Sequence, residues 1–122
     1  MYFTTSIASR KEGTLYGVLD KMKTPMGKRK LRYELTHPLQ DIKKIKKRHD
    51  FIEAFLSDII LLEKIQKELK NISDIDGILN RISLNRMVLR DMILLKKSLQ
   101  AFQNIETLIE KSDNKTLKKM FI

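Results

Sequence analysis

The chain has 122 residues, 42% of them hydrophobic and 33% charged, so it is long enough for one domain or part of one. It contains no cysteine, which excludes disulfides and cysteine-ligated metal sites and fits a reducing cytosol. No apolar run is long enough to span a bilayer, and polar residues interrupt any apolar signal segment at Thr4, Thr5, Ser6 and Ser9. We therefore expect no membrane partner.

The formal net charge of +10 is concentrated in the N-terminal part of the chain. Residues 10–48 carry 13 Lys/Arg and four Asp/Glu, a net charge of +9, whereas residues 49–122 carry 12 and 11, a net charge of +1. Such an asymmetry indicates an acidic partner, most commonly nucleic acid. Lysine-rich, solvated helix faces would give the same pattern, so charge alone leaves both interpretations open.

The first predicted elements are a short lead-in and two helices. Only four glycines and two prolines occur, which favours long helices with short connections. We expect residues 1–13 to be a lead-in with a short extended segment, because Thr4 and Thr5 favour strand. From residue 14 an apolar stripe predicts a helix with Leu15, Tyr16, Val18, Leu19 and Met22. Thr24 and Pro25 predict the start of the next helix, and Pro38 predicts its end.

Asp41 is the predicted N-cap of the strongest helix. Its apolar stripe is Ile42, Ile45, His49, Ile52, Phe55 and Leu56. The helical pattern continues over residues 59–69, restarts at Ser73 or Asp74, and runs again over about residues 88–102. Ile105, Leu108 and Ile109 suggest one more helix, fading into a polar stretch at 111–119.

The sequence therefore predicts an all-α fold: a bundle-like array of short and medium helices. We expect residues 1–122 to form a single helical domain fragment. Within it, residues 14–105 would be the helical core, and residues 106–122 would be the start of a further helix or a tail.

No pattern in the chain predicts catalysis. The four glycines never have the spacing of a phosphate-binding loop. His37 and His49 lie on different predicted elements, so they do not form a metal site. Asp74 and Asp76 are two residues apart at a helix start, where they are typical of capping rather than of acid–base catalysis. We expect no catalytic, cofactor-binding or metal-binding residue in this chain.

The remaining candidate site is basic. Lysine and arginine can neutralise phosphates, and Tyr33 could stack on a base, although a single tyrosine at helical spacing more commonly packs. Residues 21–35 also resemble a helix-turn-helix with Gly27 in the turn, but many unrelated helix pairs share that pattern. The candidate nucleic-acid contacts are Lys28, Lys30, Arg32, Lys43, Lys44 and Lys47.

Residues 24–39 read T-P-M-G-K-R-K-L-R-Y-E-L-T-H-P-L. The pattern T-x-M-G-x-R-x-L-R followed by P-L resembles the core domain, domain III, of the MutS family of DNA mismatch-repair proteins. Residues 13–20, 41–48, 74–81 and 90–99 are similar to further family patterns in the same order. The matching motif residues are Thr24, Met26, Gly27, Arg29, Leu31, Pro38, Leu39, Arg48, Asp74, Arg81, Arg90 and Asp91.

Three positions depart from the family pattern. Glu34 stands where Trp is common, Gly77 replaces an Arg, and Leu89 stands where a Pro often precedes Arg-Asp. The first departure puts the packing around Glu34 in question.

The resemblance implies a function that composition does not. MutS proteins are dimeric ATPases in which one domain reads the mismatch, a clamp grips the duplex and a C-terminal domain hydrolyses ATP. This chain resembles the first half of the core domain that joins them. The resemblance thus implies a structural, non-catalytic connector, with ATP and Mg bound elsewhere in the parent protein. It also implies that Arg29, Arg48 and Arg81 make contacts within the domain.

The partners implied by the resemblance are the remainder of the polypeptide, mismatched duplex DNA and a second subunit of a homodimer. The implied location is the bacterial cytoplasm, in association with the nucleoid. Because the family's core domain is completed by helices absent from this sequence, we expect an uncovered apolar stripe. Two other interpretations stay open: a stand-alone basic helical protein that binds nucleic acid through residues 10–48, and a protein-interaction module.

Overall fold

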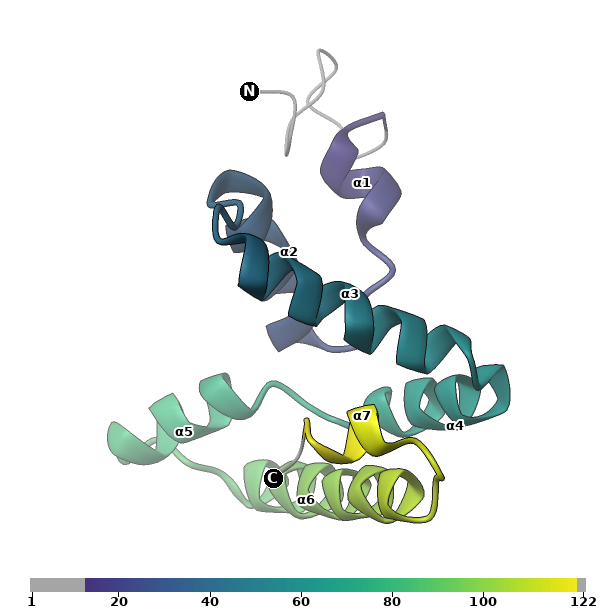
Figure 1. Ribbon diagram of the computed structural model, residues 1–122. Coiled ribbons are helices and arrows are strands. Elements are labelled where there is room, and N and C mark those ends of the chain that lie inside the picture. Colours follow the sequence, from purple (N-terminus) through teal and green to yellow (C-terminus); the bar gives the residue numbers. More distant parts are fainter. Residues whose placement is uncertain (1–12, 121–122) are drawn as a thin grey trace.

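The computed structural model describes residues 13–120, and within this range the chain forms seven helices and no strand (Figure 1). The all-α prediction is therefore confirmed. The lead-in expected over residues 1–13 lies, apart from Gly13, outside the described residues. The helices are α1 (Leu15–Leu19), α2 (Pro25–Thr36), α3 (Ile42–Leu56), α4 (Ile59–Leu69), α5 (Ile75–Ser83), α6 (Leu89–Glu110) and α7 (Lys115–Lys118).

Side-chain caps explain where the helices begin. Thr24 Oγ1 accepts a hydrogen bond from the Gly27 N–H at 3.0 Å, and Asp41 Oδ1 accepts one from the Lys43 N–H at 2.9 Å. Asp74 Oδ1 accepts one from the Gly77 N–H at 3.2 Å. Each cap satisfies a backbone donor that the first helical turn leaves without a partner. The predicted starts at these three residues are confirmed.

The helices are arranged around α3, which crosses the middle of the molecule (Figure 1). On one side α1 packs against α2. On the other side α6 packs against α4 and α5, and α7 contacts both α3 and α6. An apolar core lies among α3, α4, α6 and α7. Its buried members are Ala54, Leu61, Ile65, Ile72, Ala101, Ile105, Ile109 and Leu117.

The C-terminal helices differ from the prediction. A single helix, α6, replaces the two helices expected over residues 88–109. No Gly or Pro interrupts it, and Ala101, Ile105 and Ile109 recur every four residues toward the core. The expected division at residue 105 therefore falls inside a helix. The polar stretch that follows contains α7, whose Leu117 is 0% exposed.

Two further expectations about helix faces were wrong. The first helix ends at Leu19, so Met22 lies outside it. On α3, four residues of the predicted apolar stripe are exposed instead: His49, Ile42 (68%), Ile52 (55%) and Leu56 (60%). The reason is that α7 packs against α3 and buries Ala54, which lies on a different side of the helix.

Candidate functional site

The first motif residues on α2 position a guanidinium. Gly27 lies in the first turn of α2, where a Cβ would come within 2.9 Å of the capping Thr24 Oγ1. This position excludes the helix-turn-helix interpretation, which required Gly27 in the turn. Met26, next to it, packs against the apolar core. One turn further on, Arg29 extends from α2 toward the start of α5.

Arg29 binds two carboxylates. Its Nη1 and Nη2 donate to Asp74 Oδ2 and Oδ1 at 2.9 and 2.8 Å, and Nη2 also donates to Asp76 Oδ2 at 2.8 Å. These hydrogen bonds lower the pKa of Asp74 and raise that of Arg29. Because Asp74 is also the N-cap of α5, one carboxylate both begins α5 and joins it to α2.

A second ion pair joins α2 to α3. Arg48 Nη1 and Nη2 donate to the two carboxylate oxygens of Glu34 at 2.9 and 2.5 Å, and Lys30 Nζ lies 3.4 Å from Glu34 Oε1. The hydrogen bonds from Arg48 are the main reason that the pKa of Glu34 is lowered, against the opposing effect of burial. Glu34, which stands where the resemblance leads us to expect Trp, is thus an ion-pair partner rather than an uncompensated charge.

The third ion pair joins the end of α5 to the start of α6. Arg81 Nε and Nη2 donate to Asp91 Oδ2 and Oδ1 at 3.0 and 2.5 Å. The Val88 N–H donates to Asp91 Oδ2 at 3.2 Å, so the same carboxylate also satisfies the first turn of α6. Arg29, Arg48 and Arg81 therefore all bind carboxylates of this chain.

The other motif residues have simpler surroundings. Leu31 on α2 and Leu39 in the α2–α3 connection are half-buried. Pro38 lies exposed in the same connection, just after α2 ends at Thr36. Arg90 is exposed in the first turn of α6.

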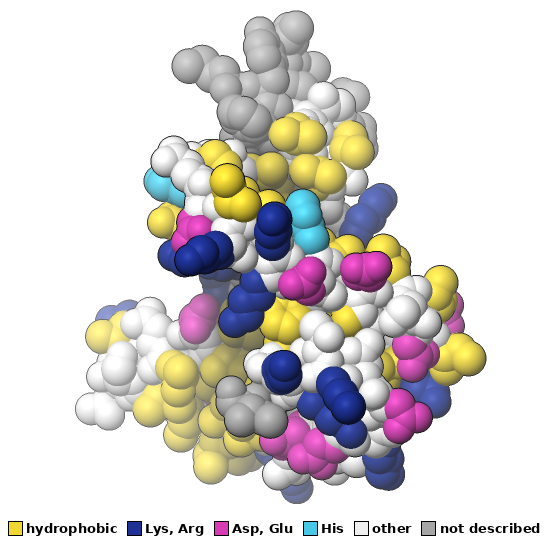
Figure 2. Space-filling model, in the orientation of Figure 1, with side chains coloured by type: hydrophobic (Ala, Val, Ile, Leu, Met, Phe, Trp, Pro, Cys, Tyr) yellow, Lys and Arg dark blue, Asp and Glu magenta, His cyan; other side chains and the backbone are white. Residues whose placement is uncertain are grey.

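The six candidate nucleic-acid contacts, Lys28, Lys30, Arg32, Lys43, Lys44 and Lys47, are all exposed. Three of them lie over aromatic rings: Lys30 is 5.7 Å from the Tyr33 ring, Arg32 4.9 Å from that of Tyr16 and Lys47 5.9 Å from that of Phe51. On the face shown in Figure 2, basic groups are interspersed with Asp and Glu. The structure therefore shows no continuous basic surface on that face.

Tyr33 already has a stacking partner. Its ring lies parallel to that of His37, with 4.3 Å between the centroids and an angle of 8° between the planes. His37 Nδ1 lies 2.9 Å from Thr36 Oγ1 and 3.2 Å from the Tyr33 carbonyl oxygen. The residues at the end of α2 thus form a local cluster that does not depend on a nucleic-acid base.

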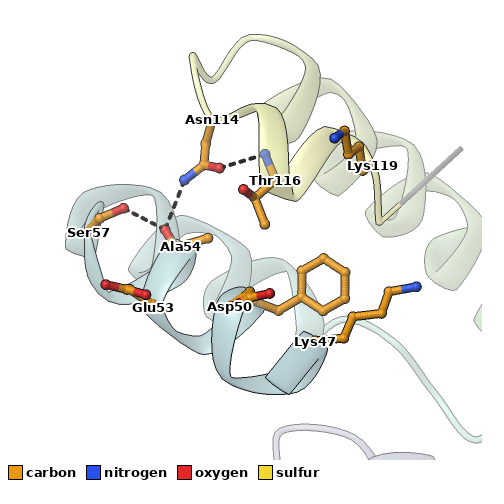
Figure 3. A pocket seen from close by; sticks show the side chains of 9 residues that line it. Lys47, Asp50, Glu53, Ala54, Ser57, Asn114, Thr116 and Lys119 are labelled. Carbon is orange, nitrogen blue, oxygen red and sulfur yellow. Dashed lines mark hydrogen bonds between the residues drawn. The ribbon is translucent and has the colours of Figure 1, made fainter. Parts of the chain in front are cut away.

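A hollow lies between α3 and α7 (Figure 3). Its lining residues are Lys47, Asp50, Phe51, Glu53, Ala54, Ser57, Asn114, Thr116 and Lys119. Asn114 Oδ1 caps α7 by accepting from the Thr116 N–H at 3.0 Å, and Asn114 Nδ2 donates to the Ala54 carbonyl at 3.2 Å. Ser57 Oγ donates to the same carbonyl at 2.8 Å. The Asn114 side chain therefore joins the two helices. In the sequence, only its position before a short helical segment could have indicated this role.

A second, apolar hollow lies along α6. Its lining residues are Met87, Met92, Leu95, Lys96, Leu99, Gln100 and Gln103. Met92 is 52% exposed and Leu99 is 56% exposed. Figure 2 shows hydrophobic side chains gathered at the lower left of the molecule, over α5 and the start of α6. An exposed apolar surface of this kind is typical of an interface with another protein segment.

Among residues 13–120, no group of three or more His, Cys, Asp or Glu residues could hold a metal ion. In the same part of the chain, no helix has the length and apolar character that crossing a membrane requires. The motif residues Arg29, Arg48 and Arg81 instead form ion pairs that join the helices.

Comparison with known proteins gives one consistent result. A family model described as MutS domain III matches residues 3–120. The chain is 35% identical over 117 residues to the DNA mismatch repair protein MutS of Acholeplasma laidlawii, which is 96% of this chain and 14% of that protein. It is 40% identical over 111 residues to MutS of Clostridioides difficile, covering 91% of this chain and 12% of that protein. For MutS of Borrelia turicatae the identity is 43% over 89 residues, covering 73% and 10%.

Proposed function

Because the chain belongs to the MutS domain III family, we propose that it is the connector segment of a MutS-type DNA mismatch-repair protein. The observation that carries the proposal is the match over residues 3–120. The chain spans about one seventh of the Acholeplasma relative and less of the other two, so the remaining functions of such a protein would lie outside this sequence.

The geometry supports a mechanical role. Ion pairs of motif residues join α2 to α5, α2 to α3 and α5 to α6. In each of the three pairs a guanidinium donates two hydrogen bonds to one carboxylate, a geometry that fixes orientation as well as distance. A segment built in this way can transmit a displacement between the parts of the parent protein that grip mismatched DNA and those that hydrolyse ATP. We propose no catalytic residue in it.

The exposed apolar surfaces support the same proposal. In the parent protein the hollow along α6 would be covered by other segments of the same polypeptide, which explains apolar side chains such as Met92 and Leu99 at the surface. The partners would be the rest of that polypeptide, mismatched duplex DNA and a second subunit. The site of action would be the nucleoid of a bacterial cell.

The size of the native polypeptide tests this proposal. An antibody against residues 40–70 would be used to immunoblot source cells. A band several times larger than 14.4 kDa is expected, since the curated relatives are much longer than this chain. A band at 14.4 kDa would contradict the proposal and point to an independent protein.

The net charge of +9 over residues 10–48 favours a second candidate, direct binding of duplex DNA by α2 and α3. It is tested by fluorescence anisotropy with a labelled duplex over a range of salt concentrations. The variant Lys28→Gln/Lys43→Gln/Lys44→Gln should bind more weakly and with a smaller salt dependence. The control removes three charges outside the region, Lys64→Gln/Lys67→Gln/Lys70→Gln. An equal loss of affinity in both variants, or an affinity that does not change with salt concentration, would contradict direct DNA binding by α2 and α3.

A further inference from the structure

The helices α1 and α2 form a unit, here called the N-terminal arm (residues 15–36). The two helices pack against each other, and the Arg32 guanidinium lies 4.9 Å from the ring of Tyr16, which is 2% exposed. The buried apolar core, in contrast, belongs to the later segments, from Ala54 to Leu117. From the arm, only Met26 packs against that core. The apolar core therefore holds the arm at one side chain only.

The arm is attached to the later helices by charge at two points. In the first half of α2, Arg29 binds Asp74 and Asp76. Near its end, Glu34 binds Arg48, close to the connection over residues 37–41. The two arginines are similarly open to solvent, at 50% for Arg29 and 45% for Arg48, and the difference lies in the carboxylates. The side chains of Asp74 and Asp76 are 40% and 71% exposed, whereas that of Glu34 is 26% exposed.

The two attachments differ in how a rotation of the arm would affect them. The Glu34–Arg48 pair lies beside the chain connection, where a rotation of the arm would move atoms least. The Arg29 pairs lie about one and a half turns earlier on α2, farther from the connection, where the same rotation would separate the partners. Water and salt compete strongly for exposed ion pairs, so the Arg29 attachment can open while the apolar core stays folded.

We propose that Arg29, Asp74 and Asp76 form a salt-sensitive latch that holds the N-terminal arm against α5, with residues 37–41 as the pivot. Closing the latch brings a guanidinium onto Asp74, the N-cap of α5. Opening it removes that charge and frees the arm, while Asp74 keeps its bond to the Gly77 N–H. Since Arg81 and Asp91 join α5 to α6, α5 is positioned to sense the state of the latch. The latch is a property of this chain and holds whether or not the proposed parent protein is correct.

Distances between paired spin labels in the full chain test the latch. The sequence contains no cysteine, so labels can be attached to introduced ones alone. The helices α3 to α7 are here called the body. Labels at Lys28→Cys on α2 and Lys97→Cys on α6 report the distance from the arm to the body. Labels at Lys64→Cys on α4 and Lys97→Cys report a distance within the body. At low salt the arm–body distances should form a single narrow distribution. At about 1 M salt, where the screening length is about 3 Å, this distribution should broaden and shift.

The substitutions separate the latch from general instability. In Arg29→Gln the arm–body distribution should be broad already at low salt, and most of its salt response should be lost. Asp76→Asn, which leaves the α5 cap in place, should have a smaller effect. Lys23→Gln, a nearby exposed charge outside the latch, should change nothing. The body pair should stay the same in every variant.

Two results would overturn the proposal. One is a distribution of arm–body distances in Arg29→Gln that matches the distribution in the unsubstituted chain at both salt concentrations. The other is a broadening of both label pairs together, because the core would then depend on Arg29 and no separate movement of the arm would exist.

Discussion

Arg81 and Asp91 form a two-point ion pair in which the acid is almost completely buried: the aspartate residue is 4% exposed, whereas the arginine side chain is 44% exposed. The carboxylate also accepts the Val88 N–H. One acidic side chain thus satisfies both a guanidinium from α5 and a backbone donor at the start of α6. Loss of Arg81 would leave the buried Asp91 carboxylate without its charged partner, which proteins tolerate poorly.

The first prediction concerns the dependence of stability on pH. The pKa of Asp91 is lowered, first by the hydrogen bond from Arg81 and then by that from the Val88 N–H. A carboxylate with a lowered folded-state pKa binds fewer protons folded than unfolded, so the free energy of unfolding rises with pH in the acidic range. The contribution is complete above about pH 4, the ordinary range of an aspartate, and is lost as pH falls through the folded-state pKa. Asp74 and Glu34 should contribute with the same sign.

Urea unfolding of Asp91→Asn checks this prediction. At pH 7 the variant should be less stable than the unsubstituted chain, and the difference should shrink as the pH is lowered through the acidic range. Asp113→Asn, a change at an exposed carboxylate, is the matched control and should leave the profile unchanged. A difference that stays constant down to the lowest pH would mean that Asp91 acts through its shape and not through its charge.

The second prediction concerns Leu117, which is 0% exposed although it lies in a polar C-terminal stretch. Leu117→Ala removes buried methyl groups where α7 meets the core, and we expect a loss of about 2–5 kcal/mol in the free energy of unfolding. Leu89→Ala, at a position 74% exposed, should cost less than about 0.5 kcal/mol. Equal and small effects in chemical unfolding would show that α7 does not belong to the core.

Local signals in the sequence predicted the helix starts. Thr24, Asp41 and Asp74 each cap a helix because a side-chain oxygen two or three residues before a backbone N–H can reach it without tertiary contacts. The all-α fold followed from the spacing of apolar residues, which recurs along most of the chain.

Contacts between residues that lie far apart in the chain could not be predicted from the sequence. The stripe on α3 predicted a core face at Ile42 and Ile52, but both are exposed because α7, more than 60 residues later, packs elsewhere on that helix. The partners of Arg29 could not be predicted for the same reason, since Asp74 and Asp76 are more than 40 residues from it. Spacing shows which side of a helix is apolar, and the tertiary fold decides which side is buried.

The third prediction concerns Ser98, a residue of α6 that is 0% exposed and contacts the connection between α4 and α5. Its Oγ accepts from the Ser73 N–H at 2.9 Å and donates to the Leu94 carbonyl at 2.8 Å. Ser98→Ala leaves that N–H without its acceptor, so we expect a loss of about 1–3 kcal/mol in the free energy of unfolding. Ser83→Ala, at an exposed serine, should change stability by less than about 0.5 kcal/mol. Similar values for both would indicate that water replaces the lost hydroxyl.

The last prediction concerns the apolar surface along α6. In this chain alone, Met92 and Leu99 are more than half exposed and lie in one hollow, so burying them between copies would be favourable. We expect the mass measured by sedimentation to rise with concentration, and the double substitution Met92→Lys/Leu99→Lys to suppress this rise. The matched control, Ile42→Lys/Ile52→Lys, places the same charges at exposed apolar positions of α3. If the control suppresses association and the α6 substitution does not, the interacting surface is on α3. A chain that stays monomeric at every concentration would show that neither surface associates and would weaken the proposal that other segments of a parent protein cover them.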